Sequence, residues 1–274
     1  MHLSNKINTL LQIADNALII GHRLSEWCVH GPILEQDIAL TNMSLDHLGQ
    51  ARSLYQYAAD LYNTLPAAQK NQLFTSTALQ TKVSAAQTIQ EDDLAFLRDA
   101  WDFKNVLLVE QTNKDWAYTI ARAFFYDAFN YLYYTALLQS NDETIAAIAQ
   151  KSLKEVTYHL RWSSEWVIRL GDGTTHSHHK MQQAINDLWP FTGELFIPSP
   201  ADDAALADGY GANIAALKSA WLQRVSNILT EATLQVPKTT WMQQGGKVGT
   251  HTEHLGFVLA ELQFMQRAYP NMQW

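Results

Sequence analysis

The chain of 274 residues has one cysteine, Cys28, so a disulfide framework within the chain is excluded. A single thiol is typical of a protein in the reducing cytoplasm. Only 17% of the residues are charged and the formal net charge is −8, so no basic face and no nucleic-acid partner are expected. No apolar run reaches the roughly 20 residues that span a bilayer, which argues against a membrane segment. The N-terminus also lacks the basic start and the cleavage site of a signal peptide.

The sequence lacks a sustained strand pattern and any repeat at solenoid periods, and its apolar residues instead recur at steps of three and four. This spacing predicts helices over about 5–30, 33–62, 91–101, 115–139, 140–170, 180–195, 212–234 and 250–268. Residues 63–90, dominated by Gln, Ala, Thr and Ser, predict a surface insert with one short helix. The first two helices, joined at Gly31-Pro32, and the third and fourth form antiparallel hairpins. We therefore predict that residues 1–274 form a single all-α domain, a ferritin-like four-helix bundle with additional C-terminal helices.

The stretch 152–170 carries two stripes at helical spacing. Leu153, Val156 and Leu160 belong to an apolar stripe that predicts packing against other helices. The second stripe contains Glu155 and His159, followed by Trp162 and Trp166. A carboxylate and an imidazole one turn apart beside a core stripe indicate either a metal half-site or a buried polar pair.

The pattern that would decide for a two-metal centre is missing. Ferritin-like bundles that hold two iron or manganese ions use a Glu from each of two helices and a Glu-x-x-His from each of the other two. In this chain no Asp or Glu is followed by a His three residues later; Glu155, for example, is followed by Tyr158 and Asp46 by Gly49. The sequence therefore predicts no catalytic residue and no metal ligand of that kind in this chain.

A polar centre nevertheless remains inside the predicted bundle. Counting outward from the two turns puts Asp127 level with Glu155, and Asp15 level with Asp46. Two further pairs are four residues apart and share a helix face. The candidate members of this polar centre are Asp46, Gln50, Asp127, Glu155 and His159. The preferred interpretation is a satisfied structural cluster, with His47, Arg52, Arg161, tyrosines or a retained proton as partners; the alternative is an atypical metal centre.

Three other features have a weaker chemical signal. The loop around Gly245, Gly246 and Lys247 resembles a phosphate-cradling loop, but it follows no strand and lacks the full Walker spacing, so we treat it as a candidate interface loop. The histidines between residues 174 and 180 are expected in an exposed loop. The Thr250–Glu253 segment has the spacing of a capping box, and its neighbours His251 and His254 are interpreted as a polar helix start.

Several segments together resemble a known family. They are RLSEW around Glu26, SLDHLGQAR at 44–52, NVLLVEQ ending at Gln111, TIAR at 119–122, KEVTYHLRWS around Glu155, LGDGT, KMQQAINDLW, GGKVGTHTEHLG at 245–256 and the terminal MQW. This set resembles the structural, C-type subunits of bacterial ring-1,2-phenylacetyl-CoA epoxidases, over nearly the whole chain except 63–90. The resemblance implies a ferritin-like bundle that supports a catalytic, A-type sister subunit. That sister would carry the di-iron site and epoxidise the ring of phenylacetyl-CoA with O₂, while a reductase supplies electrons from NADPH.

The leading hypothesis is therefore a cytoplasmic, non-catalytic subunit of a hetero-oligomer, with no cofactor of its own. Its nine Trp, eleven Tyr and ten Phe fit either a partner interface or a thick core. The other small subunits and the reductase are further candidate partners. The alternative hypothesis is a di-metal carboxylate oxidoreductase with an atypical centre of Asp46, Asp127, Glu155 and His159. A third hypothesis is a stand-alone helical adaptor.

Overall fold

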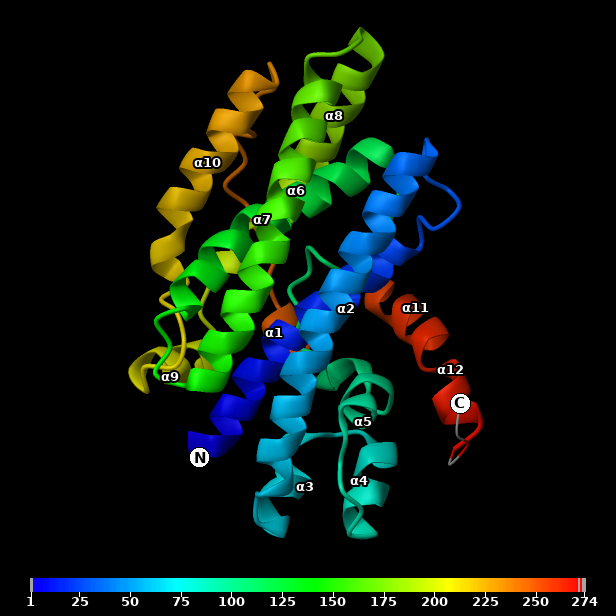
Figure 1. The fold of residues 1–274 in the computed structure, drawn as a ribbon, viewed down its shortest axis with the longest axis vertical. Helices are drawn as coiled ribbons and strands as arrows, with labels where there is room; N and C mark the ends of the chain where they lie inside the picture. Colours follow the sequence, from blue (N-terminus) through cyan, green and yellow to red (C-terminus); the bar gives the residue numbers. More distant parts are fainter. Residues whose placement is uncertain (1, 271, 273–274) are drawn as a thin grey trace.

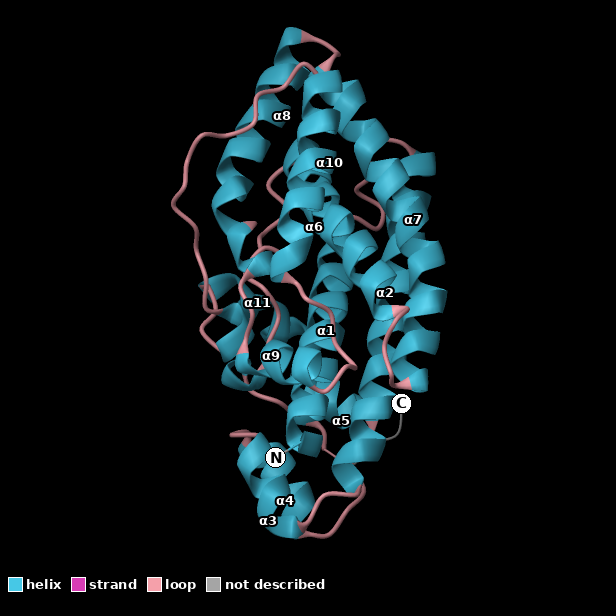
Figure 2. Cartoon of the chain, turned by 90° about the vertical axis from the view of Figure 1, so that its left-hand side faces the viewer, coloured by secondary structure: helices cyan, strands magenta, loops and turns pink. Residues whose placement is uncertain are grey.

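The structure is a computed structural model that describes residues 2–270 and 272. The described residues form helices, turns and loops, with no strand among them (Figure 2). This confirms the predicted all-α class. None of the described helices is long and apolar enough to cross a membrane.

Two antiparallel hairpins form the bundle (Figure 1). The first pairs α1 (His2–Ser25) with α2 (Leu34–Asn63), and the second pairs α6 (Trp116–Leu137) with α7 (Glu143–Gly171). Helix α2 packs on α7 and so joins the hairpins. The four helices are the predicted ferritin-like bundle, although α1 ends at Ser25 rather than near residue 30.

The segment between the hairpins contains more structure than predicted. It forms α3 (Ala67–Leu73), α4 (Thr77–Ser84) and α5 (Glu91–Phe96), so residues 63–90 hold two short helices rather than one. Phe74, Leu79 and Ile89 are buried, and they anchor the segment to the core. Its many Gln, Ala and Thr residues hid these three anchors from the sequence pattern.

The C-terminal part adds α8 (Thr175–Leu188), α9 (Pro200–Ala207), α10 (Lys218–Glu231), α11 (Glu253–Leu262) and α12 (Phe264–Ala268). Short 3₁₀ turns cover Ala100–Asp102, Trp189–Phe191, Gly193–Phe196, Ala215–Leu217 and Gly246–Val248. Two expectations are wrong here: residues 175–180 belong to α8 rather than to a loop, and α9 lies in a predicted loop. In both cases a side-chain cap starts the helix, Thr174 for α8 and Ser199 for α9.

Capping residues also fix the starts of the bundle helices. Asp115 accepts a hydrogen bond from the Tyr118 amide and caps α6. Asp142, not the predicted Ser140, caps α7 by accepting from the amides of Thr144 and Ile145. An Asp at this position satisfies two free amides and also faces the positive end of the helix dipole.

The loop before α6 runs through the interior. Residues 105–111 are all buried but form no regular helix or strand, as the interpretation of 106–109 as helix or coil allowed. Buried backbone groups need partners, and other elements supply them. Asn16 of α1 accepts from the Val106 amide, Glu194 accepts from the Leu107 amide, and Arg23 donates to the Glu110 carbonyl.

Candidate functional site

The second stripe of α7 faces α2 along the seam between the two hairpins. Gln50 of α2 donates to the Glu155 carboxylate at 2.9 Å, and Tyr134 of α6 donates to the Gln50 carbonyl at 3.2 Å. One turn further along α7, His159 Nε2 lies 3.0 Å from an Asp46 carboxylate oxygen. The acids and the imidazole of the predicted polar centre therefore each have a partner from another helix.

Tryptophans close the same seam beyond His159. The indole nitrogens of Trp162 and Trp166 both donate to the side-chain carbonyl of Gln36, at 3.1 and 2.9 Å. Trp116 of α6 packs edge-on against both indoles. This arrangement gives each of these two Trp N–H groups an acceptor while the rings fill the space between α2, α6 and α7.

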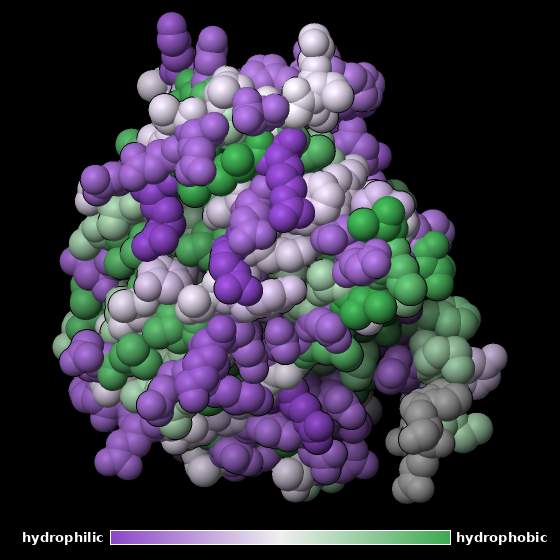
Figure 3. Space-filling view, turned by 45° about the horizontal axis from the view of Figure 1, so that its top comes forward, coloured by the Kyte–Doolittle hydropathy of each residue, from purple (hydrophilic) through white to green (hydrophobic). Residues whose placement is uncertain are grey.

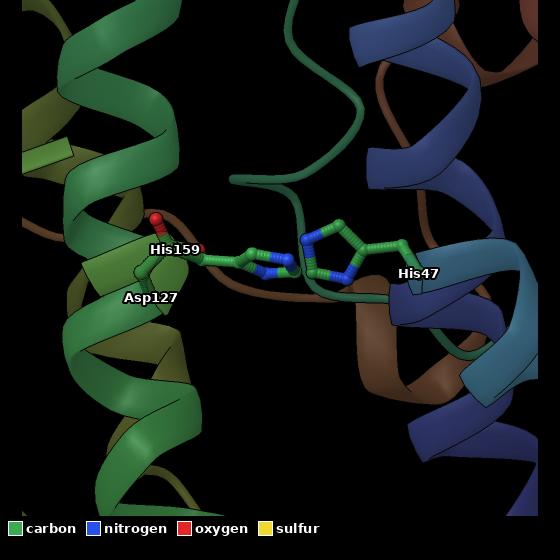
Figure 4. Close-up of side chains that lie close together, drawn as sticks. All are labelled: His47, Asp127 and His159. Carbon is green, nitrogen blue, oxygen red and sulfur yellow. The ribbon is translucent and has the colours of Figure 1, made fainter. Parts of the chain in front are cut away.

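Three buried side chains meet in the middle of the bundle (Figure 4). His47 extends from α2 and points toward His159 of α7, while Asp127 of α6 lies on the His159 side. One ligand atom from each lies within 4.8 Å of the others, and the two imidazole centres are 4.8 Å apart. We call His47, Asp127 and His159 the central cluster.

Burial dominates the electrostatics of the central cluster. Burial raises the pKa of Asp127 to about 6, although the neighbouring His159 and the hydroxyl of Ser163 oppose the shift. Ser163 donates to Asp127 at 2.8 Å. Burial and the proximity of His159 hold the pKa of His47 well below 6.5, and Gln50 only partly opposes this. His47 is therefore a neutral imidazole near pH 7.

The heights predicted by counting from the turns are wrong by about two helical turns. Asp127 contacts Ser163, eight residues beyond Glu155, and Asp15 accepts from Tyr55 rather than lying level with Asp46. Helical rise is regular, so the error comes from the two connections, which do not return the chain at the height at which it left.

His47 is the member that the sequence did not assign to the site and named only as a partner for acids. It was the wrong height count that paired α2 with the other helices through Asp46. The signal that could have found it is the buried stripe Leu40, Met43, His47, Gln50 and Leu54, at steps of three and four. On that stripe His47, not Asp46, faces the bundle interior.

These residues do not fit a two-metal carboxylate centre. Such a centre needs several acids that converge from four helices together with two histidines. In the part of the chain that the structure describes, Asp127 is the one acid in a group of three or more potential ligands that can meet at an ion. Glu155 is held by Gln50, and Asp46 is 38% exposed and paired with His159.

Comparison with known proteins places the chain in a family. Residues 2–274 match the phenylacetic acid catabolic protein family. The chain belongs to this family. It is also similar to the C-type subunit of the 1,2-phenylacetyl-CoA epoxidase of Escherichia coli (strain K12), with 46% identity over 264 residues that cover 96% of this chain and 97% of the relative. The family resemblance that we drew from the sequence segments is confirmed.

In this member of the phenylacetic acid catabolic protein family, the Gly245–Gly249 loop folds around a carboxylate. Glu194 accepts from the amides of Gly245 and Leu107 at 2.8 and 2.7 Å. Lys247 points inward, where its ammonium donates to the Ile197 carbonyl at 2.9 Å and lies 3.4 Å from Asp202. Backbone amides that already bind a carboxylate are not available to cradle a phosphate. A pocket of about 340 Å³ lies beside this loop, and Val248 is exposed at its edge, so the role as an interface loop stays a prediction.

The close approach of this loop to the interior predicts a stability effect. A Cβ atom on Gly246 would lie 2.2 Å from the Asn105 carbonyl oxygen, so Gly246→Ala forces the backbone apart. We expect the free energy of unfolding to fall by about 1–3 kcal/mol in urea titrations. Gly256 of α11 is the matched control, because a Cβ there meets nothing within 4 Å. Gly256→Ala is expected to be neutral or to stabilise by roughly 0.5–1 kcal/mol, and equal effects at the two glycines would contradict the packing role.

A buried ion pair ties the start of α11 to the interior loop and predicts a pH dependence. His251 Nδ1 lies 2.9 Å from Glu110, which also accepts from Thr252. Burial lowers the pKa of His251, but Glu110 and the Phe103 carbonyl raise it more, so the net shift is upward. The stabilisation is therefore complete below pH 6.5 and is lost as pH rises through the raised pKa.

Comparison of the parent protein with His251→Gln isolates this contribution. The difference between their free energies of unfolding is expected to be larger at pH 6 than at pH 9, because glutamine cannot gain a proton. A difference that stays constant between these pH values would show that the pair has no role in the pH dependence.

Proposed function

We propose that this chain is a non-catalytic, structural subunit of a phenylacetyl-CoA epoxidase, a multicomponent oxygenase of phenylacetate degradation. The support is its similarity over nearly its full length to a protein named as the C-type subunit of that enzyme. In this proposal a catalytic sister subunit holds the di-iron centre and epoxidises the aromatic ring. This chain binds and stabilises that sister and contributes no cofactor to oxygen activation.

The observation that carries the proposal is the donor set at the bundle centre. Two iron ions would need converging carboxylates, whereas Glu155, Asp46 and Asp15 are each committed to a partner from another element. Among the acids of the described residues, Asp127 alone joins the two buried histidines. An O₂-activating centre of the di-iron carboxylate kind is therefore not favoured here, in agreement with the missing Glu-x-x-His pairs.

The surface supports a protein partner. Large apolar side chains are exposed along the start of α2 and the turn before it, and we call this set the α2 patch: Val29, Ile33, Leu34, Ile38 and Leu45. Hydrophobic side chains also interrupt the polar surface at several places on the face seen in Figure 3. Contiguous exposed apolar side chains mark interaction sites in folded proteins. We assign the α2 patch to contact with the catalytic sister subunit in the cytoplasm; the other subunits and the reductase are further partners.

Co-expression with the catalytic subunit tests the proposal. We expect the two chains to co-elute in size exclusion, iron to follow the sister chain, and phenylacetyl-CoA oxidation to need both. Two outcomes would overturn it: a monomer that leaves the sister chain fully active and stable, or two iron ions bound by this chain alone and lost in Glu155→Ala. The second outcome would favour the alternative of a di-metal oxidoreductase.

A further inference from the structure

The central cluster has a feature that the proposed function does not use. His47, Asp127 and His159 are each at least nine-tenths buried. Among the described residues, neither ring nitrogen of His47 nor Nδ1 of His159 makes a hydrogen bond of normal geometry. Buried polar atoms without partners are costly, and three of them within one cluster need an explanation.

The surrounding contacts orient the cluster toward a ligand at its centre. Asp46 holds Nε2 of His159, so the other ring nitrogen, Nδ1, is the one left free. Histidines that bind metals usually hold a carboxylate or carbonyl at their second nitrogen in this way. Ser163 fixes Asp127 by donating to one carboxylate oxygen. Two of the three side chains thus already have the outer contacts typical of metal ligands.

The chemistry of the set selects the kind of ligand. A neutral imidazole offers a lone pair, and two imidazoles with one carboxylate suit Zn²⁺, Co²⁺ or Fe²⁺ rather than Mg²⁺ or Ca²⁺. The single carboxylate leaves one net positive charge on a divalent ion, and Asp46 lies behind His159 to offset it. No thiol is available nearby, since Cys28 lies exposed in the turn after α1.

We propose that His47, Asp127 and His159 bind one divalent transition-metal ion, with Zn²⁺ as the best match, which cross-links α2 to α6 and α7. Ligand atoms around tetrahedral zinc lie roughly 3.4 Å apart, so the present separation of up to 4.8 Å must contract. His47 can supply this movement, because no hydrogen bond of normal geometry holds its ring. The ion is structural: it needs no reaction with O₂, and it is one ion rather than a pair. The inference goes beyond the proposed function, since binding to the sister subunit does not depend on it.

Metal titration of the purified full-length chain tests the site. Isothermal titration with Zn²⁺ is expected to give one equivalent with a dissociation constant in the micromolar range or below, and Zn²⁺ to raise the melting temperature. Co²⁺ as a probe is expected to give the visible bands of a four-coordinate site. His47→Leu, which keeps the side-chain volume, and Asp127→Asn, which keeps the shape, are each expected to lose at least 90% of the bound metal.

Two controls make the result decisive. The exposed histidines of α8 are the competing site, so His176→Gln with His179→Gln is expected to keep the full equivalent of Zn²⁺. Melting curves in chelator establish that the two cluster variants remain folded; if His47→Leu does not fold, Asp127→Asn carries the test. Less than 0.2 equivalents of Zn²⁺ in the parent chain overturns the inference, and so does a full equivalent that both cluster variants retain. Either failure leaves co-elution with the sister subunit, and hence the proposed function, untouched.

Discussion

Replacement of Asp15 by alanine is expected to lower the free energy of unfolding by about 3–5 kcal/mol, because it leaves a buried guanidinium without its counter-charge. Asp15 and Arg98 form an ion pair in which both side chains are 0% exposed. Tyr55 and the amide of Lys104 donate to the same carboxylate. Although burial disfavours the charge of Arg98, Asp15 raises the pKa of Arg98 above its ordinary value, so the arginine stays charged.

The control for Asp15 is a pair in water. Glu165 and Arg169 of α7 are one turn apart and more than half exposed, so Glu165→Ala is expected to cost less than about 1 kcal/mol. A double change, Asp15→Leu with Arg98→Met, removes both charges and is expected to recover much of the loss. Urea titrations at pH 7 measure all three. A cost below about 1 kcal/mol for Asp15→Ala would show that the pair does not hold this part of the core.

The second large effect concerns assembly. Ile38→Lys combined with Leu45→Lys places two charges on the α2 patch, where the parent side chains are 51% and 61% exposed. If the patch is covered by the catalytic subunit, burial of these charges is expected to weaken the complex at least tenfold and to abolish co-elution. Because neither side chain is in the core, the melting temperature of the free chain is expected to change little.

Leu222 of α10 provides the matched control for the patch. It is another apolar helix residue, 40% exposed, on a different part of the surface. Leu222→Lys is expected to leave co-elution unchanged. Retention of the complex by the α2 variant, or equal loss in the Leu222 variant, would remove the α2 patch as the specific contact without contradicting family membership.

Local patterns determined much of this protein. Apolar spacing at three and four residues was sufficient for the four bundle helices, because each buries one face against its neighbours. The missing Glu-x-x-His pairs were also readable, because that pattern depends only on spacing within one helix. The same holds for the family segments, which are contiguous runs of residues.

Tertiary structure alone decided what meets at the centre. The height at which α2 faces α7 depends on the path of two connections, so counting residues paired Asp127 with Glu155 when its contact is Ser163. Likewise the buried path of residues 105–111 depends on Asn16, Glu194 and Arg23 from distant elements. Helical periodicity specifies which side of a helix is buried, but it contains no information about how far one helix slides along another. The central cluster exists only because that sliding brings His47 opposite His159.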